Sequence, residues 1–287
     1  MAEQSLSNEA RAPAEIARRI EAAGSRKTQG DLASVFALSI LGGAFIALGA
    51  CFATIVWTHS GLGFGMARLM GGLVFSLGLI LVVVAGAELF TGNVLLVVAW
   101  ASRKVTLSAL LRNWSIVFLG NFLGAVATAI GIYLTRQWSF VGGGVGAAAI
   151  DLAAAKVSHG FVAAFFLGAF CNALVCLAVW LCLGARSLTD QILAIVPPIT
   201  AFVAMGFEHS IANMYFIPIG LLLAGDAEAL ALAGRSAADL GHLTWLSFAW
   251  KNLLPVTLGN IVGGGVMVGA FYWFIYLRPR HSDAPAS

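Results

Sequence analysis

The chain has 287 residues, of which 60% are hydrophobic and only 10% charged, with a net charge of +3 and a mean hydropathy of +0.92. So few charged side chains would not cover the surface of a soluble protein, and that class is excluded. Six apolar stretches are long enough to cross a hydrocarbon core, which takes roughly 20 helical residues. In chain order they are residues 33–58, 66–99, 110–135, 157–184, 189–223 and 250–277. We therefore predict an all-α polytopic membrane protein with six transmembrane helices.

These spans divide the chain into three parts. We expect residues 1–30 to form an N-terminal segment, residues 31–278 the transmembrane domain, and residues 279–287 a short tail. The first 30 residues are polar and lack an apolar core followed by a small-residue cleavage site, so no conventional signal peptide is predicted. Residues 139–155 are rich in glycine and alanine and are expected to be an external loop with room for a short helix.

The distribution of lysine and arginine predicts the orientation. The two ends of the chain and the even-numbered connections, with Arg112, hold 11 of the 16 basic residues, and the odd-numbered loops hold five. Basic residues gather on the cytoplasmic side of a membrane. We therefore expect a multi-pass protein of the cytoplasmic (inner) membrane with both termini in the cytoplasm. Its predicted surroundings are lipid and a small solute, with no nucleic acid.

The chain contains an internal repeat. Residues 86–93 (GAELFTGN) and 206–213 (GFEHSIAN) share Gly-x-Glu-x4-Asn, and residues 112–124 and 251–263 share basic-Asn-x5-Leu-Gly-Asn-x2-Gly. A weaker Leu-Gly-Ala match, at Leu48 and Leu167, is better explained as a chance similarity. Three spans per repeat is an odd number, so the second repeat (157–277) must enter the membrane from the opposite side to the first (33–135). This inverted 3+3 plan is common among channels and transporters.

The second and fifth spans are too long for one crossing, and each carries one of the first motifs near its middle. Glycine allows a helix to be interrupted there, and interrupted backbone at membrane depth needs protein or a water-filled cavity around it. A carboxylate at this depth must face a cavity, accept hydrogen bonds or be protonated. We interpret four polar residues of the two breaks first as support for the loop ends: Glu88, Asn93, Glu208 and Asn213.

His209 has no counterpart in the first motif, where Leu89 holds the matching position and Thr91 follows two residues later. A histidine titrates near neutral pH, can donate from either nitrogen and can pass a proton. A single buried histidine is more often a satisfied core residue. At the break of a broken span, beside a glutamate, we favour a functional role.

Other polar residues have two readings each. Asn172 and Asn260 are struts between helices or donors to a passing anion. Lys156, expected to begin the fourth span, is an interfacial lysine or an attractor of anions at an outer vestibule. Four cysteines lie within apolar segments without metal-ligand spacing, so we predict no metal site and no cofactor.

The strings AELFTGN (87–93), GFEHSIANMYFIPIG (206–220) and NLLPVTLGNIVGG (252–264) closely resemble the formate/nitrite transporter family, over roughly residues 30–278. The resemblance implies an aquaporin-like fold, a homopentamer with one pore per protomer, and passage of formate, nitrite or hydrosulfide, in some members with a proton. It also implies that His209 and Thr91 form the central polar site, helped by Lys156, Asn172 and Asn260. The residues implied to line the constrictions are Phe75, Leu79, Leu89, Phe90 and Phe202.

Transport of formate or a similar weak-acid anion is thus the leading hypothesis. The anion moves either as in a channel or coupled to a proton through His209, and FEHSIANM favours formate over nitrite or hydrosulfide. A membrane-embedded enzyme using Glu88, Glu208 and His209 is the alternative of another class, but no nucleophile motif or cofactor fingerprint accompanies them. A structural scaffold would have little reason to place acidic residues at two symmetric helix breaks.

Overall fold

Helices make up the regular structure of residues 9–279, the part of the chain that the computed structural model describes. The first half holds α1 (Pro13–Thr28), α2 (Leu32–Trp57), α3 (Phe64–Val84), α4 (Phe90–Asn93), α5 (Leu96–Ala101) and α6 (Leu107–Leu134). After a 3-10 turn (Gln137–Ser139) follow α7 (Gly144–Lys156), α8 (Phe161–Gly184), α9 (Leu188–Ala204), α10 (Ser210–Ala224) and α11 (Ala227–Ala233). A second 3-10 turn (Ala237–Leu240) leads to the last helix.

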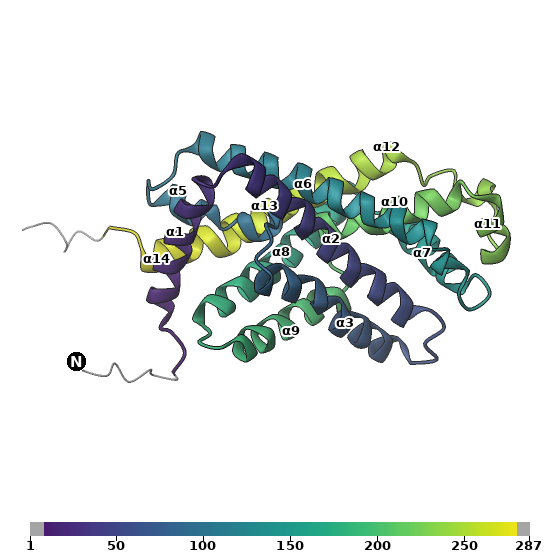
Figure 1. The fold of residues 1–287 in the computed structure, drawn as a ribbon, viewed down its shortest axis with the longest axis horizontal. Coiled ribbons are helices and arrows are strands. Elements are labelled where there is room, and N and C mark those ends of the chain that lie inside the picture. Colours follow the sequence, from purple (N-terminus) through teal and green to yellow (C-terminus); the bar gives the residue numbers. More distant parts are fainter. Residues whose placement is uncertain (1–8, 280–287) are drawn as a thin grey trace, which may run out of the picture.

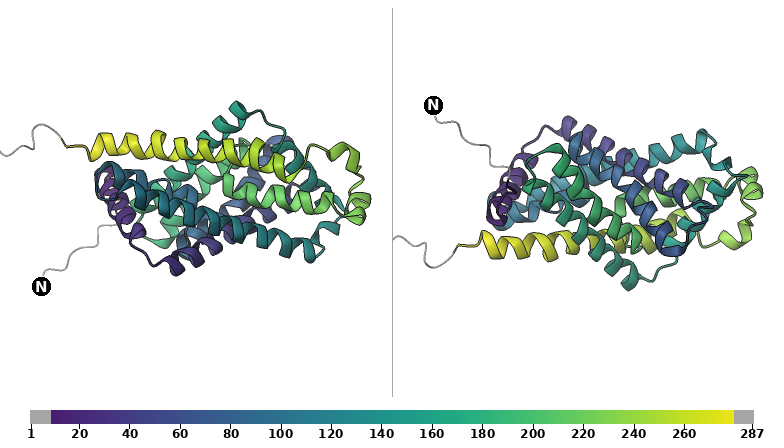
Figure 2. Two further views of the ribbon diagram at one scale, coloured as in Figure 1. Left: turned by 90° about the horizontal axis from the view of Figure 1, so that it is seen from above. Right: turned by 90° about the horizontal axis from the view of Figure 1, so that it is seen from below.

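The last helix contains α12 (Trp245–Ser247), α13 (Leu254–Ile261) and α14 (Phe271–Tyr276), joined by π-helical stretches at Phe248–Leu253 and Val262–Ala270. Figure 2 shows it extending along one side of the molecule, from green to yellow. A π-helical turn often marks a functional position within a helix. Here the stretches flank α13, which carries Asn260.

Five helices of the described residues are long and apolar enough to cross a membrane, and the pair α10–α11, bent by 99°, brings the number to six when it is taken as one span. The predicted second and fifth spans are broken at equivalent places. The helix stops at Val84 in one and at Ala204 in the other, and it resumes at Phe90 and Ser210. The prediction of two broken spans is therefore confirmed.

Two boundaries differ from the sequence prediction. The short helix allowed within the expected loop 139–155 is present as α7, but it takes up most of that segment and packs on α10. Its alanine-rich sequence favours helix. Lys156 ends α7 and does not begin the fourth span, since α8 starts at Phe161 after a short connection.

Figure 1 shows how the two halves are arranged. The short arms α3 and α9 occupy opposite halves of the view and converge on its centre, while α1 and α14 lie together at one end and α7 and α11 at the other. The helices α2 and α6 pack together as α8 and α13 do. Opposite placement of the matched arms is what an inverted repeat predicts.

Glycines permit close approach within each of these pairs. A methyl group on Gly124 would lie 1.9 Å from the carbonyl oxygen of Ile40. One on Gly263, in the π-helical stretch that follows α13, would lie 1.9 Å from that of Ala169. Small residues of this kind let membrane helices meet backbone to backbone, where dispersion contacts replace the hydrophobic effect. The contact recurs in both repeats, so the two helix pairs share one geometry.

Candidate functional site

An asparagine ties down the first helix break. Asn121 on α6 accepts a hydrogen bond from the Phe90 N–H at 2.9 Å and donates to the carbonyls of Ser39 and Glu88 at 2.7 and 2.9 Å. The Glu88 N–H donates to the Leu38 carbonyl at 3.1 Å. Backbone groups released by the interruption must find partners at membrane depth, and this amide provides them.

The same bonds recur at the second break. Asn260 on α13 accepts from the Ser210 N–H at 2.9 Å and donates to the carbonyls of Gly168 and Glu208 at 2.8 and 3.1 Å. The Glu208 N–H donates to the Leu167 carbonyl at 3.2 Å. Leu167 therefore corresponds to Leu38, so the Leu-Gly-Ala match with Leu48 is out of register.

Each glutamate is held by a lysine and an asparagine. At one end of the molecule, Lys27 Nζ lies 2.8 Å from Glu88 Oε1, and Asn93 Nδ2 donates to Glu88 Oε2 at 2.6 Å. Asn113 accepts from Asn93 at 3.0 Å and donates to the Lys27 carbonyl at 3.3 Å. Glu88 is thus a paired carboxylate at the end of a broken helix.

At the other end, Lys156 Nζ lies 2.7 Å from Glu208 Oε1, and Asn213 Nδ2 donates to Glu208 Oε2 at 2.6 Å. Asn252 accepts from Asn213 at 2.7 Å and donates to the Lys156 carbonyl at 2.8 Å. The two networks match residue for residue. Lys156 therefore stands opposite Glu208, as Lys27 stands opposite Glu88.

Thr91 and His209 join the two breaks at the centre of the molecule. Thr91 Oγ1 lies 3.0 Å from His209 Nε2, and both side chains are buried. His209 Nδ1 accepts a hydrogen bond from the Ala212 N–H at 3.1 Å and so caps α10. With Nδ1 an acceptor, the neutral ring carries its proton on Nε2 and donates to Thr91. The Thr91 hydroxyl keeps its own proton for another acceptor.

Asn172 supports Thr91 from the backbone side. Its Nδ2 donates to the carbonyls of Thr91 and Asn260 at 3.2 and 2.7 Å, and Cys176 Sγ lies 3.4 Å from the same Thr91 carbonyl. Both amide protons of Asn172 are engaged, as are those of Asn260. In this arrangement the two asparagines hold backbone in place and offer no free N–H to a solute.

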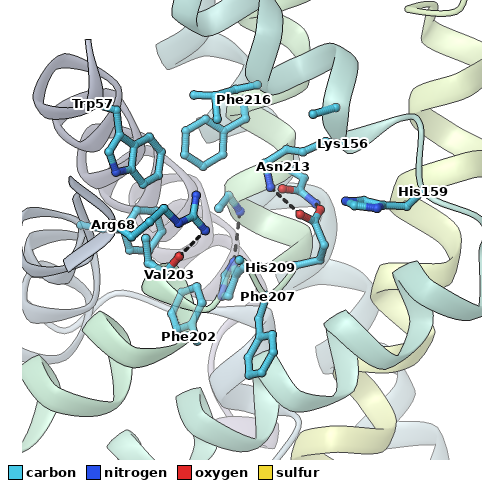
Figure 3. A pocket seen from close by; sticks show the side chains of 16 residues that line it. Trp57, Arg68, Lys156, His159, Phe202, Val203, Phe207, His209, Asn213 and Phe216 are labelled. Carbon is cyan, nitrogen blue, oxygen red and sulfur yellow. Dashed lines mark hydrogen bonds and ion pairs between the residues drawn. The ribbon is translucent and has the colours of Figure 1, made fainter. Parts of the chain in front are cut away.

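A cavity of about 210 Å³ reaches His209 from the end where α7 lies. Figure 3 shows Lys156, Asn213 and Phe216 on one side of it and Trp57 and Arg68 on another. The rings of Phe75 and Phe202 meet edge to face at 5.6 Å between centroids, and Phe202 stacks on His209 at 5.9 Å. These two phenylalanines form the apolar floor of the cavity beside the central site.

The other predicted constriction residues are buried away from the cavity surface. Leu79 and Leu89 belong to the main hydrophobic core. The Phe90 ring packs edge to face on Phe118, 5.0 Å between centroids, and on Trp114. The structure thus brings Phe75, Phe202 and His209 to one surface and sets Leu79, Leu89 and Phe90 behind it.

A model of the formate/nitrite transporter family matches residues 14–274. The formate channel FocA of Escherichia coli (strain K12) is 44% identical over 269 residues, covering 93% of this chain and 94% of that protein. A probable formate transporter of Methanothermobacter thermautotrophicus is 37% identical, with 93% and 98% covered. The chain belongs to the formate/nitrite transporter family.

Solved structures of the formate/nitrite transporter family agree with this assignment. A pentameric formate channel with formate bound superposes with a TM-score of 0.81 at 45% identity, covering 86% of this chain and 98% of that chain. An ion channel of the same family gives a TM-score of 0.79 at 27% identity, covering 92% of this chain and 99% of the other. The protein is therefore a membrane transport protein by family, and its fold is that of these channels.

Sequence reasoning missed two cations of this transporter. Lys27 was counted with the basic N-terminal segment, although it pairs with Glu88. Lys27 and Lys156 are 129 residues apart, as are Leu38 and Leu167, but the pairing of these two leucines is seen only in the hydrogen bonds of the structure. Arg68 was counted only for orientation, although it lines the cavity. No group of three metal-ligating side chains occurs among residues 9–279.

Proposed function

We propose that this protein conducts formate, or a similar small monovalent weak-acid anion, through a path that passes Thr91 and His209. The observation that carries the proposal is the 3.0 Å hydrogen bond joining these side chains where the two broken spans meet. Relatives aligned over nearly the whole chain are named as formate channels, and one solved relative holds formate. These relatives favour formate over nitrite or hydrosulfide. The proposed role is transport and not catalysis.

Thr91 is the proposed donor to the anion. Its hydroxyl accepts from His209 Nε2 and can donate its own proton to a carboxylate oxygen, so His209 orients and polarises the group that meets the solute. An anion leaving water for this buried site loses hydration worth several kcal/mol or more. A hydrogen bond from the positioned Thr91 hydroxyl offsets part of the lost hydration free energy.

Proton coupling needs a rearrangement at the start of α10. A second proton on His209 would sit on Nδ1, which faces the Ala212 N–H at 3.1 Å. Two N–H groups cannot share that contact, so the ring must release its cap or turn over before it can hand a proton to formate. Proton symport by His209 is therefore proposed as a step that opens the first turn of α10, and passage of the anion alone leaves that turn intact.

The proposed setting is the inner (cytoplasmic) membrane, with both termini in the cytoplasm and five protomers that each hold one pore. The clustering of basic residues at the termini and even-numbered connections supports the orientation. The 0.81 TM-score with a pentameric formate channel supports the assembly.

The test reconstitutes the purified protein in liposomes and measures the uptake of formate, nitrite and hydrosulfide at several pH values. Formate should cross fastest. Thr91→Val keeps the shape of the side chain and removes the donor, so formate flux should fall roughly 10- to 100-fold, the value of one hydrogen bond to a charged group. Thr91→Ser retains the hydroxyl and should retain most of the flux. Exclusion of all three solutes would refute the proposal, and faster nitrite would reassign the substrate.

A further inference from the structure

The charges around the cavity are not balanced. Lys156 lies 2.7 Å from Glu208, so that pair presents little net charge to an approaching ion. Arg68 also lines the cavity, and none of the ion pairs among residues 9–279 includes it. Of the two basic residues Lys156 and Arg68 that line this cavity, Arg68 is therefore the one without a carboxylate partner.

Backbone carbonyls hold the Arg68 guanidinium in place. Its Nε donates to the Ala204 carbonyl at 3.1 Å and its Nη2 to the Val203 carbonyl at 2.7 Å. These carbonyls end α9, where the helix dipole is negative and backbone acceptors lack helical partners. The guanidinium lies 5.4 Å from the Trp57 ring, whose Nε1 donates to the Ala67 carbonyl at 3.1 Å. Its position is thus fixed without a carboxylate.

The remaining N–H groups of Arg68 are available to a ligand. Nη1 donates to no residue of the described chain, and Nη2 has a second proton. Gly206, with φ of +75°, passes beside the guanidinium, and a methyl group there would lie only 3.0 Å from Nη2. Figure 3 shows the guanidinium reaching toward the space above Phe202 and His209. A planar fork of donors in this position matches a carboxylate or another small oxyanion.

The position in the second repeat that corresponds to Arg68 is apolar. The residue 120 positions after Arg68, the spacing that relates Glu88 to Glu208, is Leu188, an exposed apolar side chain. The lysine at the other end of the pore, Lys27, is paired with Glu88 at 2.8 Å. Arg112 also lines a cavity at that end, but that cavity measures only about 10 Å³. The two ends thus share their scaffold and differ at the position of Arg68.

We infer that Arg68 is the anion-capture residue of this vestibule, binding a small monovalent carboxylate such as formate before it passes Phe75 and Phe202. The inference rests on the proposed function. It transfers to Arg68 the attracting role that the sequence suggested for Lys156, which instead serves Glu208. A fixed charge beside a narrow cavity raises the local concentration of the ion and its rate of arrival.

Sided membrane vesicles test the inference. Vesicles whose terminal tag resists added protease expose the Arg68 end, and inverted vesicles expose the other. For uptake from the Arg68 end, Arg68→Gln should raise the half-saturating formate concentration about three- to tenfold at low ionic strength and weaken its dependence on salt. Maximal flux and uptake from the opposite end should change little. Arg68→Lys keeps the charge and loses the planar fork, so it should keep the salt dependence and give a half-saturating concentration between those of Arg68→Gln and the unaltered protein.

The matched control is Arg136→Gln, which removes a cation near the same end that is already paired with Glu228 and should leave uptake unchanged. Equal loss of maximal flux from both ends, in Arg68→Gln and Arg68→Lys alike, would make Arg68 a strut for α9 and overturn the inference. So would salt dependence that persists in Arg68→Gln and vanishes in Lys156→Gln. Normal formate flux with no change in Arg68→Gln would leave the proposed function standing, whereas no formate flux in the unaltered protein would remove both.

Discussion

The two helix breaks are held by corresponding residues and stand in different surroundings. At the second break, the side chains of Lys156 and Glu208 are 15% and 4% exposed; at the first, those of Lys27 and Glu88 are 34% and 13% exposed. The cavity beside Glu208 measures about 210 Å³, against about 10 Å³ beside Lys27, where α1 packs against α5. The scaffold thus recurs at both breaks, and the two residues that we propose to act on the solute, His209 and Arg68, are on one side of it.

Removing one glutamate at a time should break this symmetry most strongly. Glu208→Ala leaves Lys156 buried without a partner, which should lower the free energy of unfolding by about 3–5 kcal/mol. Glu88→Ala leaves a lysine that water reaches, so the loss should be about 1 kcal/mol. Thermal unfolding of the purified protein in detergent measures both. Glutamine at either position keeps the bonds to asparagine and should lose less than alanine; equal losses at the two ends would contradict the difference in burial.

The asparagines should behave alike where the glutamates do not. Asn260→Leu and Asn121→Leu each remove one acceptor and two donations to backbone carbonyls at a helix break. Unsatisfied buried backbone groups should reduce the free energy of unfolding by about 2–3 kcal/mol in both variants. Thermal unfolding of the two purified variants in detergent measures both losses. A loss at Asn260 alone would show that the first break is held mainly by α1 and Lys27.

Replacing His209 makes the second break a copy of the first. His209→Leu places there the residue found at Leu89, and formate flux should fall about tenfold, or 1.4 kcal/mol, because Thr91 loses the donor that orients it. The pH dependence of flux should change as well. His209→Asn retains an acceptor for the start of α10 and serves as the control for capping. Liposome uptake at several pH values checks the result, and unaltered flux with an unaltered pH profile would remove His209 from the mechanism.

The two helix breaks could be predicted because the residues that form them lie close together in the sequence, within short motifs. Glycine, glutamate and asparagine at fixed spacing report an interrupted helix whose released backbone groups need partners, and the repeat of that motif gave both positions. The partners of the glutamates were harder to predict. Lys27 and Lys156 lie 61 and 52 residues from their carboxylates in the sequence, and only the folded chain brings them together.

Charge roles in the vestibule could not be predicted for a related reason. The position of Lys156 near a membrane boundary allows two readings, an interfacial lysine or an attractor of anions, and its pairing with Glu208 is not visible in the sequence. Arg68 appeared as one basic residue in an outer loop, since nothing in the sequence shows that α9 ends beside it. The net electrostatic field in the vestibule depends on which charged side chains are paired, and the tertiary structure determines that pairing.

The smallest expected effects concern the glycines that turn the chain at each break. Gly86 and Gly206 have φ of +81° and +75°, a region that other residues enter at a cost of about 1 kcal/mol. Alanine at either position should lower the free energy of unfolding by about that amount. The positions differ in space, since a methyl group at Gly86 meets nothing within 4 Å, whereas at Gly206 it lies 3.0 Å from Arg68 Nη2.

Gly206→Ala should therefore shift the guanidinium and raise the half-saturating formate concentration for uptake from the Arg68 end. Gly86→Ala, with the same backbone strain, should leave that concentration unchanged and so separates strain from displacement. The measurement is uptake in sided vesicles beside thermal unfolding of each variant. If both variants lose stability equally and neither alters uptake, the vestibule does not depend on the exact place of Arg68, and the functional difference between the two breaks reduces to His209.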